Sequence, residues 1–239
     1  MEPVRRVFRF YLRRHRELIH AEMARILDDD AANLDRHRQR IAAEATVRFI
    51  EQSLPNVQST DSASALLQTS INAARIGVGE LVLELGVFEG NSINLIADSV
   101  GPSVSVFGFD SFEGLPERWR DGFDARAFAI DGLPKVRPNV HLVKGWFAET
   151  LPAFLQSQTG PVAFVHVDCD LYSSTKEALS TLAARFRPGA VIVFDEYFNY
   201  PGWEDGEFRA LQELAREHPL AFDYIGFNRY GRQIAIRVR

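Results

Sequence analysis

Cysteine is nearly absent from this sequence, with only Cys169 among 239 residues. A single cysteine excludes an internal disulfide and a multi-cysteine zinc site, and such low usage fits a reducing compartment. No apolar stretch approaches the roughly 18 residues needed to span a bilayer. Arginines near the N-terminus interrupt any signal-peptide core. We therefore expect a cytoplasmic protein.

An excess of positive charge is also missing. Lys and Arg number 27 against 32 Asp and Glu, which gives a formal net charge of −5, whereas a nucleic-acid partner usually requires a basic face. Hydrophobic residues make up 46% and charged residues 25% of the chain, as in ordinary soluble globular proteins. We expect neither a nucleic-acid partner nor a membrane partner.

The first 60 residues differ in pattern from the rest. Apolar residues recur at spacings of three and four over 4–54, with arginines between them, so this segment is expected to be helical. Three aspartates at 28–30 interrupt the pattern, and a second helix is expected over about 36–53. We assign 1–60 to an N-terminal helical extension. It would dock on the domain or on a second subunit, which makes a homodimer an expectation; membrane-surface binding is the alternative.

Strand and helix patterns alternate through the second predicted domain, residues 61–239. After a helix over 62–76, strands are expected at 81–85, 104–109, 140–144, 162–168, 190–194, 221–227 and 233–238. Helices are expected near 91–99, 149–157, 174–185 and 204–217. This alternation predicts parallel strands with helices on both faces of the sheet. The short link between the last two strands predicts an antiparallel hairpin.

The segment 81–92, LVLELGVFEGNS, and the later Asp110 form the most informative pattern. An apolar strand leads into a glycine turn and a helix start. Gly86 and Gly90 would let the backbone approach a ligand where a side chain would collide. Asp110 lies 20 residues beyond Gly90, a spacing that suits a carboxylate accepting hydrogen bonds from ribose hydroxyls.

The glycine spacing separates two kinds of nucleotide site. A dinucleotide fingerprint is G-x-G-x-x-G, but Val87 and Phe88 stand where its middle glycine would fall. Glu84, just before the turn, suits a ligand with a cationic amine, and the next helix could be capped by Asn91 or Ser92. The pattern resembles motif I of class I methyltransferases, which bind S-adenosylmethionine. The cofactor-binding candidates are Glu84, Gly86, Val87, Gly90, Asn91, Ser92, Asp110, Ser111, Phe112, Trp146 and Phe147.

Two acidic pairs follow apolar runs at predicted strand ends. Asp168 and Asp170 follow one strand, and Asp195 and Glu196 follow the next. Ligands of open parallel sheets bind beyond the carboxyl ends of the strands, so the acids are expected to converge. An all-oxygen cluster suits a hard ion such as Mg²⁺; alternatively, Asp170 only caps a helix and Glu196 points to solvent. His166 is expected to be a buried, hydrogen-bonded side chain rather than a catalytic one.

Three motifs resemble one enzyme family. Residues 110–116 (DSFEGLP), 168–175 (DCDLYSST) and 195–197 (DEY) look like those of the macrocin O-methyltransferases, which are S-adenosylmethionine- and Mg²⁺-dependent and methylate sugar hydroxyls of natural products. The resemblance covers roughly residues 60–215. It implies an α/β, Rossmann-like class I methyltransferase fold. This is a mostly parallel seven-stranded sheet with a C-terminal antiparallel hairpin, here following the N-terminal helical extension.

The strand-end acids also look like those of catechol O-methyltransferase, which implies Asp168, Asp195 and Glu196 as metal ligands. The last two are usually Asp-Asp or Asp-Asn, so Glu196 departs from the pattern. Asp168 is expected to be the catalytic base, or only a metal ligand. The aromatic loop at 197–203 would line the acceptor pocket or pack on its own domain, and residues 113–133 would form a lid.

The resemblance therefore implies a Mg²⁺-dependent enzyme that moves a methyl group from S-adenosylmethionine to a hydroxyl of a small molecule, with a sugar or natural product as one option. Two alternatives are a metal-independent methyltransferase and a non-catalytic S-adenosylmethionine-binding interaction module. A third, an NAD-dependent dehydrogenase, is disfavoured by the glycine spacing.

Overall fold

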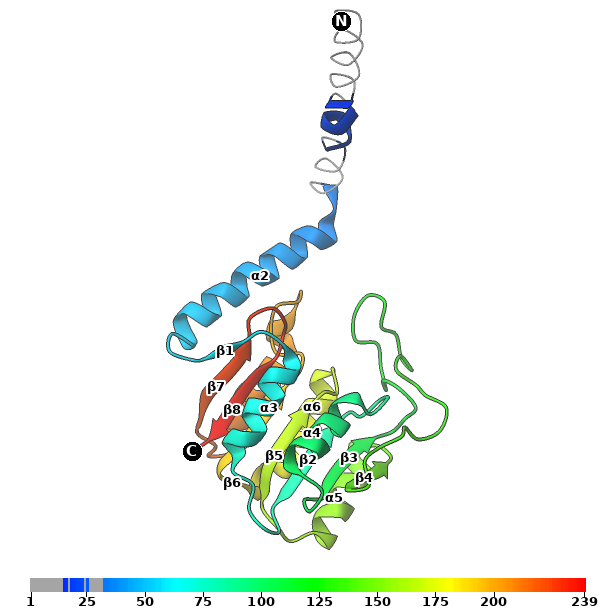
Figure 1. Ribbon diagram of the computed structural model, residues 1–239, viewed down its shortest axis with the longest axis vertical. Coiled ribbons are helices and arrows are strands. Elements are labelled where there is room, and N and C mark those ends of the chain that lie inside the picture. Colours follow the sequence, from blue (N-terminus) through cyan, green and yellow to red (C-terminus); the bar gives the residue numbers. More distant parts are fainter. Residues whose placement is uncertain (1–14, 17, 24, 26–31) are drawn as a thin grey trace, which may run out of the picture.

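The computed structural model describes residues 15–16, 18–23, 25 and 32–239 (Figure 1). Its strands are β1 (Ser59–Thr60), β2 (Leu81–Leu85), β3 (Val106–Asp110), β4 (Val140–Lys144), β5 (Val162–Val167), β6 (Phe186–Phe194), β7 (Phe222–Asn228) and β8 (Ile234–Val238). Its α-helices are α2 (Leu34–Ser53), α3 (Ala63–Ala74), α4 (Asn91–Val100), α5 (Phe147–Ser157), α6 (Tyr172–Leu182) and α7 (Glu207–Glu217).

The strands form one sheet in the order β1-β7-β8-β6-β5-β2-β3-β4. The run from β6 through β5, β2 and β3 to β4 is parallel, and β8 is antiparallel to both β6 and β7. The predicted fold class and its C-terminal hairpin are therefore confirmed. The sheet has eight described strands instead of the expected seven, because β1 pairs in parallel with β7. Two residues are too few to show a strand period in the sequence.

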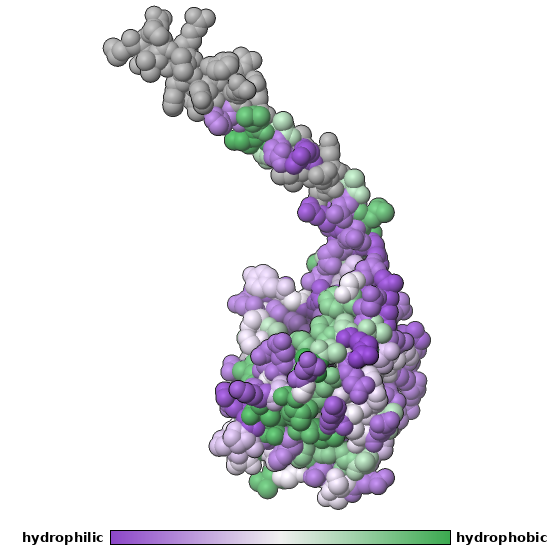
Figure 2. All heavy atoms as spheres, turned by 90° about the vertical axis from the view of Figure 1, so that its right-hand side faces the viewer, coloured by the Kyte–Doolittle hydropathy of each residue, from purple (hydrophilic) through white to green (hydrophobic). Residues whose placement is uncertain are grey.

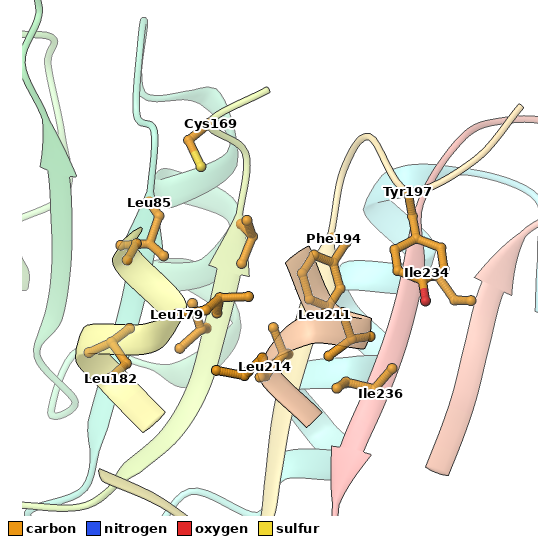
Figure 3. Close-up of a cluster of buried hydrophobic side chains, with 14 of the residues drawn as sticks. Leu85, Cys169, Leu179, Leu182, Phe194, Tyr197, Leu211, Leu214, Ile234 and Ile236 are labelled. Carbon is orange, nitrogen blue, oxygen red and sulfur yellow. The ribbon is translucent and has the colours of Figure 1, made fainter. Parts of the chain in front are cut away.

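Helices cover both faces of the sheet, which explains why β2 and β5 are apolar along nearly their whole length. Every residue of these two strands is buried, as expected for parallel strands packed on both faces. Apolar side chains of α3 and α4 join one hydrophobic cluster, and those of α5, α6 and α7 join the other. Figure 3 shows Leu179 and Leu182 of α6 and Leu211 and Leu214 of α7 beside the strands of the second cluster.

Most of the first predicted helix, including its interruption at 28–30, lies outside the described residues. Residues 15–16, 18–23 and 25 are helical, and Leu18, Ile19 and Met23 are exposed there. The predicted second helix is confirmed as α2, and the helix over 62–76 as α3, capped by Ser62. None of the helices in the described segments is long and apolar enough to cross a membrane. In Figure 2, hydrophobic side chains gather in one area of the globular part among hydrophilic ones.

The aromatic loop after β6 belongs to the core and not to a ligand pocket. Its large side chains are almost fully buried, namely Tyr197, Phe198, Tyr200 and Trp203. Phe49 of α2 packs edge-on against Trp203 at 5.8 Å between ring centroids, and Thr46 Oγ1 accepts a hydrogen bond from the Asn199 backbone at 2.9 Å. The predicted acceptor wall at 197–203 is therefore wrong, and the alternative of packing on its own domain is correct.

Candidate active site

A cavity of about 740 Å³ lies at the carboxyl ends of β2, β3 and β5. β2 and β5 are neighbours, but β2 is followed by β3 on one side of the pair and β5 by β6 on the other. Ligands of open α/β sheets bind where the strand order reverses in this way. The volume is typical of small-molecule sites. The lining comes from residues within 86–88, 110–128, 145–147 and 168–177 and from Glu196. Segments far apart in the sequence thus share one hollow.

Gly86 allows two strand ends to meet at the cavity floor. Its φ is +90°, and a Cβ atom placed there would lie 1.9 Å from the Asp168 carbonyl oxygen. Any side chain would therefore push the turn after β2 away from the end of β5. The Asp168 backbone also donates to the Leu85 carbonyl at 2.8 Å. The glycine turn and the first acidic pair are consequently in direct contact.

Asp110 holds that turn in shape. Its Oδ2 accepts hydrogen bonds from the backbone N–H groups of Val87 at 2.8 Å and Phe88 at 2.9 Å, and its Oδ1 accepts one from Phe112 at 2.6 Å. Carboxylate oxygens keep further acceptor capacity beyond these bonds. Because Asp110 also lines the cavity, it can face a ligand while it fixes the loop.

The predicted cofactor residues divide into two groups. Those that line the cavity are Gly86, Val87, Asp110, Ser111, Trp146 and Phe147, whereas Glu84, Gly90, Asn91, Ser92 and Phe112 do not. The predicted capping by Asn91 or Ser92 is wrong, because α4 already begins at Asn91. Its N-cap is Gly90, with φ +83° and no side-chain hydrogen bond. The N–H groups of the first turn are left without a side-chain cap as a result.

Aromatic rings stand at the rim of the cavity. Phe88, Phe128 and Trp146 are each 37% exposed, and the Phe88 and Phe128 rings meet at 5.5 Å. Large aromatic side chains with free faces beside a hollow can pack against a flat ring of a ligand. Phe128 belongs to the predicted lid, and parts of that segment, the long loop between β3 and β4 in Figure 1, line the cavity. Movement of this loop stays a prediction.

One group of polar side chains lies deep at the ends of the central strands, and we call Glu84, His166, Asp168 and Asp195 the histidine cluster. His166 Nδ1 lies 2.8 Å from Glu84 Oε1, and both side chains are buried. His166 Nε2 points toward Asp195 Oδ1 at 3.9 Å. Burial alone would lower the pKa of His166, but Glu84, together with Asp168 and Asp195, outweighs burial and raises the pKa to about 9. His166 is thus buried and partnered, as predicted, and Glu84 contacts it instead of lining the cavity.

A second group contains two cations, and we call Asp170, Glu196, Arg120 and Arg232 the arginine cluster. Arg232 Nη1 donates to both Glu196 oxygens at 2.8 and 2.9 Å. Arg120, from the predicted lid, lies 4.0 Å from Glu196 Oε1, and its guanidinium sits 3.8 Å from the Trp119 ring centroid. The spacing of the strand-end acids gave no sign of either arginine, since both come from distant loops.

Asp170 does not act as a helix cap. The N-cap of α6 is Leu171, with no side-chain hydrogen bond, and Asp170 itself has a φ of +61°. Its side chain lines the cavity. Burial and the charges of Glu196 and Asp195 raise the pKa of Asp170 to about 7, although Arg120 and Arg232 oppose the shift. A carboxyl group with this pKa is suited to accept a proton near neutral pH, a role that the sequence reasoning missed.

The three predicted metal ligands do not form one cluster. Asp168 and Asp195 each offer an oxygen within 4.8 Å of the other and of a His166 nitrogen. Burial and the charge of Asp195 raise the pKa of Asp168, a repulsion that a cation would relieve. These two acids therefore suit a divalent ion. Glu196 is held by Arg232, so its predicted ligand role would require that contact to break.

Comparisons with known proteins agree with this geometry. The model of a methyltransferase domain family matches residues 83–197. A tetracenomycin-C rhamnosyl 4'-O-methyltransferase from Streptomyces olivaceus is 34% identical over 142 residues, covering 50% of this chain and 53% of the relative. The demethyldecarbamoylnovobiocin O-methyltransferase of Streptomyces niveus is 29% identical over 167 residues, covering 58% and 61%. The chain thus spans between half and two thirds of the length of these relatives.

Among solved structures, a calicheamicin methyltransferase aligns with a TM-score of 0.56 and 25% identity over 73% of this chain and 78% of its own. The sheet order, the cavity at the strand ends and this likeness define a class I, Rossmann-like methyltransferase fold. Residues 83–197 are thus similar to a methyltransferase domain family, and the fold is that of class I methyltransferases. The narrower resemblance to the macrocin enzymes is close to these relatives, but none of them bears that name.

Proposed function

We propose that this protein transfers a methyl group from S-adenosylmethionine to a hydroxyl group of a natural product, with a sugar unit as the acceptor. One observation carries the proposal. The glycine turn and Asp110, which suit the methyl donor, line the same cavity as Asp168 and Asp170, which suit the acceptor hydroxyl. Opposite placement of these two ends would have left no route for direct transfer between bound molecules.

The acceptor class is supported by the names of the relatives. One is named for a rhamnosyl derivative of tetracenomycin C and the other for demethyldecarbamoylnovobiocin. The cavity has room beyond a nucleoside-sized ligand, and its aromatic rim offers flat apolar faces that suit a sugar ring or an aglycone.

Methyl transfer requires alignment of the donor methyl group with the acceptor oxygen and removal of one proton. The donor supplies an activated methyl group, so a bond forms between the acceptor oxygen and the methyl carbon while the carbon–sulfur bond breaks. The turn at 86–88 and Asp110 would position the methyl donor, and the acids would position the acceptor hydroxyl in line with it. The hydroxyl proton passes to a carboxylate.

Asp168 and Asp170 are the two candidate bases. Asp168 was expected from the sequence and lies next to Asp195, where a divalent ion such as Mg²⁺ would lower the pKa of the acceptor hydroxyl. Asp170 lines the same cavity outside that group and has a pKa of about 7. We assign ion binding to Asp168 and proton removal to Asp170, since an ion-bound carboxylate is a weaker base.

Calorimetric titration with S-adenosylhomocysteine tests the donor site. We expect one site per chain, and we expect Trp146→Ala to weaken it about fivefold through loss of a stacking face worth roughly 1 kcal/mol. Asp223 is an exposed acid on β7 that is not part of the cavity lining. Asp223→Asn is therefore the matched control and should bind as the unaltered protein does. No heat of binding at millimolar ligand would overturn the proposal.

Turnover with labelled S-adenosylmethionine tests the acceptor. A panel should contain rhamnosides, an unglycosylated polyketide and a catechol, each with and without EDTA. Transfer to rhamnosides above the other acceptors is the expected result. Transfer to the catechol alone would reject the sugar class, and undiminished turnover after chelation would remove the ion from the mechanism.

A further inference from the structure

The acids at the ends of β5 and β6 are partitioned between two charge environments. In the arginine cluster two guanidiniums approach Glu196, and their positive charges also act on Asp170. The histidine cluster places three carboxyl groups, those of Glu84, Asp168 and Asp195, around the single ring of His166. Of the two, the histidine cluster is therefore the one with an excess of negative charge that its own side chains do not balance.

Strand alternation explains the partition. Phe164 and Val193 belong to the hydrophobic cluster under α3 and α4, while Val167 and Phe194 belong to the opposite one. Side chains two residues apart share a face of a strand. His166 therefore follows Phe164, and Asp195 follows Val193, onto the same face. The side chain of Glu196 follows that of Phe194, away from them and toward Arg232.

The His166 ring is aimed into its cluster. The side chain is 4% exposed, and Nδ1 is taken by Glu84. No hydrogen bond to Nε2 occurs among the described residues, and this atom faces Asp195 Oδ1 at 3.9 Å. Histidines that bind metals usually give their other ring nitrogen to a carboxylate or a backbone carbonyl. The Glu84–His166 contact has that form.

We infer that the divalent ion of this protein is held by His166 Nε2, Asp168 and Asp195, with Glu84 orienting the ring and Glu196 excluded. The inference rests on the proposed function only for the presence of an ion. One ligand atom from each of the three residues already lies within 4.8 Å of the others. A ring nitrogen beside two carboxylates favours an ion such as Mn²⁺ over Mg²⁺, which prefers oxygen ligands alone.

Direct measurement of Mn²⁺ binding tests this ligand set without turnover. Free Mn²⁺ is counted by its electron paramagnetic resonance signal, and pulsed measurements on the bound ion detect a directly coordinated ring nitrogen. In the unaltered protein we expect one Mn²⁺ per chain with a nitrogen coupling, and weaker competition by Mg²⁺. Because this readout needs no substitution, it does not depend on whether a variant folds.

Three variants separate the alternatives. His166→Asn retains a donor near the position of Nδ1 and removes Nε2, and it should abolish the nitrogen coupling and weaken Mn²⁺ binding at least about tenfold. Glu196→Gln should leave both unchanged within about twofold. Glu84→Gln should weaken binding about 10- to 100-fold, as loss of an orienting partner does.

The opposite outcomes are equally clear. Bound Mn²⁺ without a nitrogen coupling, together with loss of binding in Glu196→Gln, would restore the three-carboxylate site. No Mn²⁺ binding at millimolar concentration would overturn the inference altogether. S-adenosylhomocysteine titration of the same samples distinguishes this failure from failure of the proposed function, since donor binding depends on the turn at 86–88 and Asp110 and not on the ion.

Discussion

The histidine cluster and the arginine cluster begin from almost the same sequence feature, an acidic pair at the end of a parallel strand. Their surroundings then diverge. Glu196 receives two hydrogen bonds from Arg232, whereas the neighbouring Asp195 faces an imidazole ring and Asp168. A guanidinium is a permanent counter-charge, but an imidazole can lose its proton and offer a lone pair. In the arginine cluster the negative charge is thus paired by the chain's own guanidiniums, whereas the histidine cluster can accept an ion.

The difference is also the basis on which we propose separate roles for two aspartates that lie two residues apart in the sequence. Asp168 lies with the group that suits a cation, and Asp170 lies with the two arginines. Both side chains line the cavity. A carboxylate that stays free of the ion but close to the acceptor can take the proton of the acceptor hydroxyl. Substitutions of Asp168 and Asp170 should therefore have different effects.

The largest effect is expected from Asp170→Asn. Removing a general base typically costs about 10²- to 10⁴-fold in rate, so kcat should fall by that factor while binding of Mn²⁺ and S-adenosylhomocysteine stays unchanged. In Asp168→Asn, by contrast, loss of Mn²⁺ binding should be the primary defect. Turnover measured beside both titrations tests the comparison. If Asp170→Asn retains full turnover and Asp168→Asn abolishes it with the ion still bound, Asp168 is the base.

A large effect on stability is expected from Phe49→Ala. Phe49 of α2 contacts the aromatic loop after β6, which also carries Tyr200, and the Arg120 and Arg232 guanidiniums lie 5.5 and 5.6 Å from the Tyr200 ring centroid. The N-terminal extension therefore supports the arginine cluster. Loss of a large, partly buried aromatic ring should lower the free energy of unfolding by about 3 kcal/mol. Urea denaturation measures it.

Val47→Ala is the matched control on the same helix. Val47 is 53% exposed, so its truncation should change the free energy of unfolding by less than about 0.5 kcal/mol. Equal effects of the two substitutions would mean that α2 does not dock on the domain through Phe49. The predicted division of the chain near residue 60 would then describe two independent parts.

The sequence predicted the frame of the molecule better than its site. Apolar runs and glycines identified β2, β5 and the hairpin, because burial on both faces leaves a clear compositional signal. The convergence of Asp110 and Asp168 on one cavity also followed from the rule for strand ends. The partners of Glu196 did not, because Arg120 and Arg232 reach it from a loop and a hairpin whose positions depend on the complete fold. The aromatic loop likewise looked like a pocket wall because composition does not show which face is covered.

A smaller effect is expected from Arg232→Gln. Among the described residues it leaves Glu196, whose side chain is 11% exposed, with the more distant Arg120 as its cationic neighbour. An incompletely paired buried carboxylate costs about 1–3 kcal/mol, so urea denaturation should show a loss of that order. Adding Glu196→Gln to the variant should recover part of it, because the unpaired charge is then gone. A further loss in the double variant would mean that Arg232 stabilises the fold through contacts other than Glu196.

The smallest effect concerns Glu213 on α7, a carboxylate outside both clusters whose pKa moves the other way. A hydrogen bond from Tyr172, followed by those from Arg209 and Lys176, lowers the pKa of Glu213 to about 2. An acid with a depressed pKa stabilises the fold above its unfolded pKa and loses this contribution as the pH falls toward the folded value. The Tm deficit of Glu213→Gln should therefore be present at pH 7 and shrink steadily between about pH 4.5 and pH 2. Thermal unfolding followed across that range by circular dichroism measures it. A deficit that stays constant with pH would show that the hydrogen bonds of Glu213, and not its charge, stabilise the contact between α6 and α7.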